Sequence, residues 1–130
     1  MSVNQQTASR PVLVLFEVTV KEGCMEAYLR QGAGIKPLIA GAEGFIRAGR
    51  FQSLSNSRTL LGITEWKDEA SVQAWRNVLE HRLAQKAGRE SFFEDYTITV
   101  ASSLRRYTMS DRKEAPEDSN RFHGAGPEAV

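Results

Sequence analysis

The sequence predicts an α+β protein in which one four-stranded antiparallel sheet carries two helices on a single face. Three observations support this class. The spacing of apolar residues changes repeatedly between period two, typical of strands, and the three-to-four spacing of helices. These segments follow the order strand, helix, strand, strand, helix, strand, which is the ferredoxin-like βαββαβ arrangement. The chain has 130 residues, 41% hydrophobic and 25% charged, so it suits one domain of ordinary globular composition.

The first two elements have clear patterns. Residues 11–20 read PVLVLFEVTV, in which every second residue from Val12 to Val20 is apolar. This alternation predicts a strand whose one face is fully buried. Residues 22–39 follow with apolar side chains at helical spacing and with two glutamates near the first turn, where the helix dipole favours acids. This segment is therefore predicted to be a helix with one buried stripe.

The remaining elements are a hairpin, a second helix and a last strand. Residues 45–53 and 59–66 are apolar runs around a short polar break, which predicts a hairpin. Asp68 is a good N-cap for a helix that is expected to continue, with a bend, through 88–93. Residues 96–107 alternate again and are predicted to be the last strand. The apolar stripe of the second helix consists of Val72, Trp75, Leu79 and Leu83.

The pattern divides the chain into a flexible N-terminus at residues 1–10, a folded domain at 11–108 and a C-terminal tail at 109–130. The tail contains few large apolar residues and is expected to be mobile, although Phe122 and His123 could dock on a neighbouring chain. The polar N-terminus lacks the apolar core of a secretory signal, and no apolar run approaches the roughly 20 residues that span a bilayer. A cytoplasmic protein without a membrane partner is expected.

Charge and motifs argue against several classes of function. The net charge is +1 with scattered basic residues, so no nucleic-acid partner is expected. RNA-recognition domains share the element order, but the strand TLLGITEW lacks their basic aromatic motif. Two distant histidines and the single Cys24, which suits a small packing role, offer no metal cluster. Glycine-rich phosphate loops are also missing, so no cofactor is expected.

The sheet face without helices must be exposed to solvent, bind a ligand or pack against another sheet. Leu13 and Leu15 alternate with the buried positions of the first strand, so either assignment of faces leaves apolar side chains on the uncovered side. Burying such a side chain stabilises by roughly 1.5 to 3 kcal/mol. The sequence therefore predicts a homodimer joined through sheet faces.

The segment from Glu65 to Tyr96 holds both tryptophans and one of the two histidines: EWKDEASVQAWRNVLEHRLAQKAGRESFFEDY. Its combination of EW, AWR, EHR, AQ, GR and FFEDY resembles the antibiotic biosynthesis monooxygenase family of dimeric α+β-barrel proteins, over about Leu13 to Tyr107. The resemblance implies one site per protomer between sheet and helices. Members oxidise phenols or hydroquinones with dioxygen and no metal or flavin, or degrade haem, and many have no known activity.

The haem-degrading branch fits this chain poorly. The resemblance implies a tryptophan in the second helix, which Trp75 matches, but Gln85 stands where the iron-ligating histidine is expected. Phe16 likewise stands at the place of an asparagine on the first strand. Haem degradation of that type is therefore not expected. His81, one turn before Gln85, could replace the missing ligand only if the helix shifted.

Oxidation of a small aromatic substrate needs aromatic walls, a base and a few hydrogen-bond donors. His81 suits proton transfer, since the ordinary pKa of histidine is about 6.5. Each candidate also has a purely structural interpretation, as core packing, a solvated helix residue or a salt bridge. A non-catalytic dimeric protein that binds small molecules is the alternative, and it would not need His81. The catalytic candidates are His81 and Trp75, and the substrate-binding candidates are Phe16, Trp66, Arg47, Arg50 and Gln85.

Overall fold

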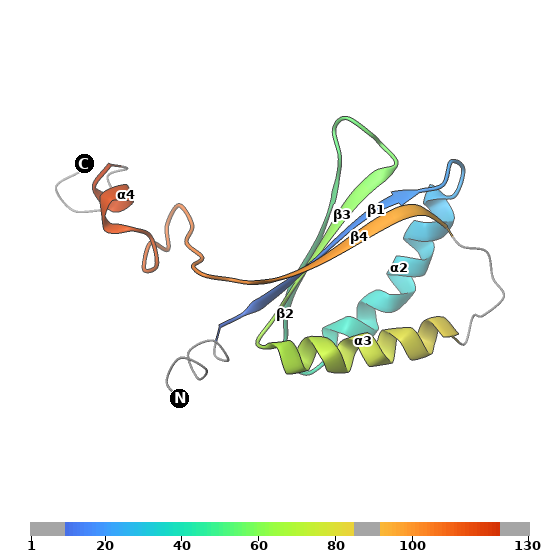
Figure 1. Ribbon diagram of the computed structural model, residues 1–130, viewed down its shortest axis with the longest axis horizontal. Helices are drawn as coiled ribbons and strands as arrows, with labels where there is room; N and C mark the ends of the chain where they lie inside the picture. Colours follow the sequence, from blue (N-terminus) through green and yellow to red (C-terminus); the bar gives the residue numbers. More distant parts are fainter. Residues whose placement is uncertain (1–9, 85–91, 123–130) are drawn as a thin grey trace.

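The structure is a computed structural model that describes residues 10–84 and 92–122, without the side chains of residues 79–84. The first six elements follow the predicted βαββαβ order, and a short helix is added in the tail (Figure 1). The elements are β1 (Val12–Val20), α2 (Met25–Ala40), β2 (Phe45–Gln52), β3 (Thr59–Trp66), α3 (Glu69–Ala84), β4 (Phe93–Ser102) and α4 (Glu117–Phe122).

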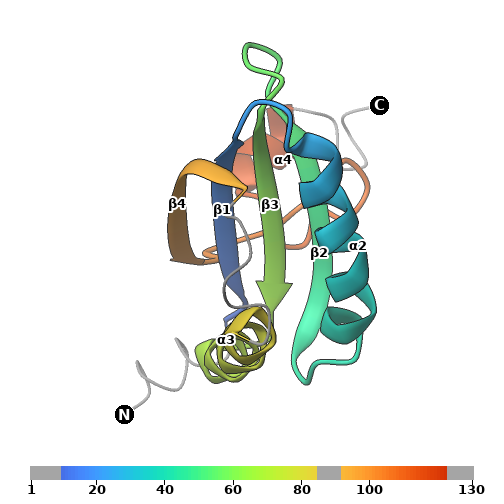
Figure 2. The same ribbon diagram turned by 90° about the vertical axis from the view of Figure 1, so that its right-hand side faces the viewer.

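The four strands form one antiparallel sheet in the order β2-β3-β1-β4. Helices α2 and α3 lie on the same side of this sheet, α2 toward β2 and α3 across one end (Figure 2). This arrangement confirms the predicted ferredoxin-like α+β fold. In the part of the chain that the structure describes, no helix is long and apolar enough to cross a membrane.

The strand register assigns side chains to two faces. Trp66 contacts Trp75 of α3, so its side of the sheet is the helix-bearing face. Val18 pairs with Leu60 on this same face, and the buried core consists of Val18, Val20, Leu60 and Trp66. The apolar period-two positions of β1 therefore face the helices, which settles a choice that the sequence left open. The opposite side, the uncovered face, carries Leu13, Leu15, Glu17 and Thr19 of β1, with Thr59, Leu61, Ile63 and Glu65 of β3.

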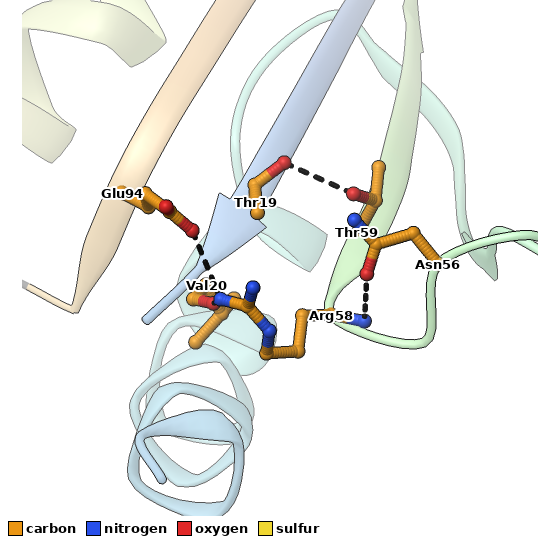
Figure 3. Close-up of polar contacts among 6 residues, drawn as sticks. All are labelled: Thr19, Val20, Asn56, Arg58, Thr59 and Glu94. Atoms are coloured by element: carbon orange, nitrogen blue, oxygen red, sulfur yellow. Dashed lines mark hydrogen bonds and ion pairs between the residues drawn. The ribbon is translucent and has the colours of Figure 1, made fainter. Parts of the chain in front are cut away.

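One end of the sheet is tied together by Arg58, at the start of β3. Its guanidinium donates to the Val20 carbonyl oxygen at 2.8 Å and pairs with Glu94 of β4 at 2.9 Å (Figure 3). Thr19 and Thr59 hydroxyls are 2.9 Å apart beside it. These contacts join the ends of β1, β3 and β4. Strands β1 and β4 carry aromatic side chains of the surface described below.

The start of α3 is held by Asp68 and by the turn before β2. The Asp68 carboxylate accepts hydrogen bonds from the Ser71 backbone N–H at 2.9 Å and hydroxyl at 2.8 Å. These bonds lower the pKa of Asp68 and confirm the predicted N-cap. Gly44 has a φ of +83°, and a Cβ there would collide with the buried Ser71 side chain. Glycine is therefore required at this turn.

Two predicted boundaries of the last strand were wrong. The helical interpretation of 88–93 fails at Phe93, which opens β4 and pairs with Val20 across a bulge; residues 85–91 lie outside the described part. Strand β4 ends at Ser102, because β1 begins at Val12 and offers no strand partner beyond it. Only the Ser103 N–H still donates to the Pro11 carbonyl oxygen, at 2.9 Å.

Residues 103–122, called the arm here, leave the sheet on the side of the uncovered face (Figures 1 and 2). Arg112 organises the arm by donating to Asn120 at 3.0 Å, Ser119 at 3.0 Å and the Thr108 carbonyl oxygen at 3.1 Å. The predicted tail thus contains turns and the short helix α4. Leu104, Met109 and Phe122 are largely exposed on the arm. His123 lies outside the described residues, so its docking stays a prediction.

Candidate functional site

The helix-bearing face holds a pair of stacked tryptophans at one end. The rings of Trp66 and Trp75 have centroids 6.1 Å apart and planes 28° apart. Phe45 meets Trp66 edge-on at 5.5 Å, and the Trp66 indole N–H donates to the Thr64 hydroxyl at 2.8 Å. Trp66 is fully buried and Trp75 partly so. This tryptophan pair joins α3 to β3 and forms an aromatic wall.

A second aromatic group, the four-ring cluster, lies toward the other end of the same face. Phe16 contacts Phe93 at 5.8 Å and Tyr96 at 5.6 Å, and Phe93 contacts Tyr96 at 5.9 Å. Tyr28 of α2 meets Phe93 edge-on at 5.6 Å. The cluster therefore connects β1, β4 and α2 through ring contacts, which are favourable in edge-to-face geometry.

Small residues separate the two aromatic groups. The register places Gly62 between Phe16 and Arg50, and places Thr64 beside Ala48 in the next row. A Cβ added to Gly62 would meet only the Phe16 carbonyl oxygen, at 3.9 Å, so no described side chain lies on this glycine. We call Ala48, Gly62 and Thr64 the small-residue floor. A flat ring could rest on it with aromatic side chains at both ends.

The β4 edge of this face leaves apolar side chains accessible. Tyr96, Ile98 and Val100 are 53%, 55% and 51% exposed, although their register partners on β1 face the helices. Figure 2 shows the reason, since α2 lies toward β2 and β4 forms the opposite edge. The surface beside the floor is thus apolar and accessible, which suits an apolar ligand.

Arg50 lies at the β2 side of the floor, against α2. Its guanidinium carbon is 5.8 Å from the centre of the Tyr28 ring. The guanidinium also packs over Gly32, where a Cβ would collide with it. Burial raises the pKa of Tyr28, and the charge of Arg50 lowers it by a smaller amount. The Tyr28 hydroxyl therefore stays protonated at neutral pH and is suited to donate a hydrogen bond.

Arg47 does not lie on the same face as Arg50, and its predicted role in substrate binding stays a prediction. Its Nε donates to Glu65 Oε1 at 2.6 Å, and the register places both residues on the uncovered face. Glu65 is only 4% exposed there. The physical reason is strand alternation: three positions separate Arg47 from Arg50, so the two arginines point to opposite faces.

The structure brings four of the predicted site residues to one face: Phe16, Arg50, Trp66 and Trp75. His81 belongs to α3, but its side chain is not described, and Gln85 lies outside the described residues. Six residues separate Trp75 from His81, so the two positions lie on different faces of a regular helix. Because the His81 side chain and Gln85 are not described, the predicted roles of these two residues stay predictions.

Sequence reasoning missed three contributors to this face. Tyr28 looked like one more apolar position of the first helix, and Phe93 was expected in a helix. Gly62 had a recognisable signal, because a glycine inside a strand often marks a place where something approaches the backbone closely. Tyr96 was correctly placed in a strand, but its contact with Phe16 depends on strand pairing.

Among the described residues, Phe16 departs from the haem-degrading arrangement that the resemblance implies, whereas Trp75 matches it. Phe16, at the place of the expected asparagine, puts an apolar ring into the four-ring cluster and offers no hydrogen bond there. Among the side chains of the described ranges, no group of three or more His, Cys, Asp or Glu residues is placed to hold a metal ion.

The fold and the face together define a ferredoxin-like α+β protein with aromatic side chains lining the helix-bearing face of its sheet. Residues 11–87 match the family described as antibiotic biosynthesis monooxygenase. The chain belongs to this family, which confirms the resemblance seen in the sequence. It is 34% identical, over 87 residues, to a jasmonate monooxygenase of Pyricularia oryzae; this covers 67% of the chain but only 40% of that relative's length.

Solved structures confirm the fold. A Pseudomonas aeruginosa protein aligns with a TM-score of 0.64 at 22% identity, over 75% of this chain and 98% of that one. A putative antibiotic biosynthesis monooxygenase from Nitrosomonas europaea gives 0.64 at 13% identity, over 74% and 92%. The haem-degrader of Mycobacterium tuberculosis, solved with two haems in its active site, gives 0.58 at 15% identity, over 75% and 99%. At these identities the likeness concerns the fold alone.

Proposed function

We propose that the helix-bearing face binds a small aromatic compound of the phenol or hydroquinone type and that the protein oxidises it with dioxygen, without a metal or flavin. The observation that carries this proposal is the small-residue floor, which lies between the tryptophan pair and the four-ring cluster. A flat ring over Gly62 would contact aromatic side chains at both ends. Membership of the family supports an oxygenase as the class of protein.

The proposed reaction balances without an added reductant. Phenol and dioxygen give benzoquinone and water, so one oxygen atom enters the ring and the other leaves as water. All four electrons come from the substrate. The deprotonated phenol can pass the first electron to dioxygen, which makes removal of the phenolic proton the first task of the protein. The protein must also hold the ring and keep water away from it.

We assign the proton acceptor to His81, because its ordinary pKa of about 6.5 suits a base at neutral pH. Tyr28 is unsuited to this role, since burial raises the pKa of its hydroxyl. In this proposal Phe16 and Trp75 hold the ring, and the fully buried Trp66 supports Trp75 by stacking on it. Arg50 and Gln85 supply hydrogen bonds to the substrate oxygens.

The test is oxygen uptake with a panel of hydroquinones and phenols, to which jasmonate is added because the relative's name gives it as a substrate. We expect uptake by the wild-type protein and about a 100-fold loss in His81→Ala. The matched control is His123→Ala, which removes the other histidine of the chain. Isotopically labelled dioxygen should place one oxygen atom in the product. Unchanged turnover in His81→Ala would remove this histidine from the mechanism.

The competing function is a non-catalytic binding protein. The same protein and the same panel of compounds distinguish it from an oxygenase. Calorimetric binding of hydroquinones without oxygen uptake across the panel would reject the oxygenase proposal. A parallel haem titration is expected to show no specific complex. The reason is that the apolar ring of Phe16 stands where haem-degrading members are expected to have an asparagine. A stoichiometric complex that releases iron with a reductant would favour the haem-degrading activity instead.

We also infer a homodimer joined through the uncovered faces of two sheets. This face carries partly exposed aliphatic side chains at its centre, and Phe51 at its β2 edge is 55% exposed. The arm leaves the sheet on the same side, so a second copy seated on this face would lie beside it (Figure 1). Sedimentation at micromolar concentration should show a dimer. The central residues are Leu13, Leu15, Leu61 and Ile63.

A further inference from the structure

Arg50 stands out by its charge among the described strand residues of the helix-bearing face. The paired strand positions of the helix-bearing face are apolar, small or neutral polar, with Arg50 as their one charged residue. Other arginines of the sheet have carboxylate partners: Arg47 pairs with Glu65 and Arg58 pairs with Glu94. Among the described side chains, no carboxylate forms an ion pair with Arg50. Its charge is therefore available to a ligand.

The guanidinium of Arg50 packs on α2 on one side, while the residue as a whole is exposed. It lies against α2, over Gly32 and beside the Tyr28 ring, and glycine at position 32 leaves the room that it fills. An arginine held in this way loses little freedom when it binds an anion. The protonated Tyr28 hydroxyl belongs to the same corner and can add a second donor. Two donors of this kind match the oxygens of a carboxylate better than they match a neutral group.

The register sets the distance from this corner to the floor. Arg50 is the direct neighbour of Gly62, and Phe16 follows on the next strand. A ring resting on Gly62 would therefore place a substituent on its β2 side next to the guanidinium. The opposite side of the ring would lie toward Phe16, and its end toward the tryptophan pair.

We propose that the preferred ligand of this face is an aromatic carboxylate whose acid group binds Arg50 while its ring lies on Gly62. This inference rests on the proposed binding face but not on the proposed oxidation. It narrows the substrate class from small phenols in general to those that carry a carboxylate, such as dihydroxybenzoates.

The test compares two compounds of nearly equal shape, 2,5-dihydroxybenzoate and its neutral amide, by titration calorimetry on the full-length protein. We expect the wild-type protein to bind the acid about 10-fold or more tightly than the amide, as for a charge-assisted hydrogen bond. Arg50→Gln should abolish this preference, because its affinity for the acid should fall at least 10-fold further than its affinity for the amide. Arg50→Lys should keep part of it, because the charge remains without the planar fork.

The control is Arg30→Gln, which removes an equal charge from the exposed side of α2 and should leave the preference intact. Circular dichroism confirms that the variants fold. Equal binding of acid and amide by the wild-type protein, or a preference that survives in Arg50→Gln, would overturn the inference. The inference would also be overturned if Arg50→Gln slowed the oxidation of both compounds equally and left both binding affinities unchanged. Arg50 would then stabilise only the developing phenolate.

The two proposals fail separately in this experiment. Binding of the acid through Arg50 without oxygen uptake would reject the oxidation and retain the carboxylate site. Equal oxidation of acid and amide by wild-type protein and Arg50→Gln would reject the carboxylate site and retain the oxidation.

Discussion

The two faces of the sheet come from the same strands but offer different surfaces. The helix-bearing face has large rings at both ends, small residues between them and one cation. The uncovered face has aliphatic side chains along its centre, the Arg47–Glu65 ion pair near one end, and Glu17 of β1. Small residues flanked by aromatic side chains, as on the helix-bearing face, suit a small flat ligand. A broader, mainly aliphatic surface, as on the uncovered face, suits contact with another protein. Strand alternation thus lets one sheet provide a ligand site and a partner site.

The largest expected effect concerns the uncovered face. Leu15→Asp places a carboxylate at its centre, and a symmetric dimer would bury two of them, so we expect dimer affinity to fall about 1,000-fold. Analytical ultracentrifugation measures this change. Leu54→Asp is the control, because Leu54 is fully exposed in the loop between β2 and β3. Phe51→Asp, at an exposed position of the same face, gives a second test if Leu15→Asp folds poorly.

The next effect concerns the turn that carries the chain from α2 into β2. Gly44→Ala forces a side chain into a positive-φ position against Ser71, so we expect the free energy of unfolding to fall by about 3 kcal/mol. Gly34→Ala is the opposite case, since a Cβ there meets nothing within 4 Å, and it should raise stability by about 0.5 to 1 kcal/mol. Urea denaturation at one protein concentration compares both variants. Equal stabilities would contradict the steric account.

A smaller loss is expected when the ion pair on the uncovered face is broken. Arg47→Met leaves the buried Glu65 carboxylate unpaired and should cost about 2 kcal/mol, less than a fully buried pair because the Arg47 side chain is 43% exposed. The double variant with Glu65→Leu should recover most of this loss, because no charge then stays buried. Chemical denaturation of the single and double variants gives the coupling energy. Additive losses would show that the two side chains act independently.

The smallest effect is the dependence of stability on alkaline pH. Burial raises the pKa of Tyr28 above its ordinary value of 10.0, so above that pH the unfolded chain loses a proton that the folded chain keeps. The stability contributed by this group is complete below pH 10 and is lost as the pH rises through the folded-state value. Tyr28→Phe should therefore show a shallower decline above pH 10 in urea denaturation. A slope identical to that of the wild-type protein would place the alkaline sensitivity elsewhere.

The element order and the wholly apolar face of β1 could be predicted because they depend on local spacing. The valines of β1 alternate with Leu13 and Leu15, and Asp68 precedes an apolar helical stripe, whatever the rest of the chain does. The choice between Arg47 and Arg50 could not be made in this way. Strand β2 contains a register shift between Phe45 and Arg47, so the face of each arginine depends on its pairing with β3.

By itself the sequence determined the α+β class, the strand and helix order, the N-cap at Asp68 and the family resemblance carried by the segment around both tryptophans. Tertiary structure alone decided that Gly62 lies between Phe16 and Arg50 with none of the described side chains upon it, and that Arg47 turns away to Glu65. The physical reason is the range of the interactions. Periodicity and capping act within a few residues, whereas the floor and its cation depend on strands that are distant in the chain and meet only when the sheet forms.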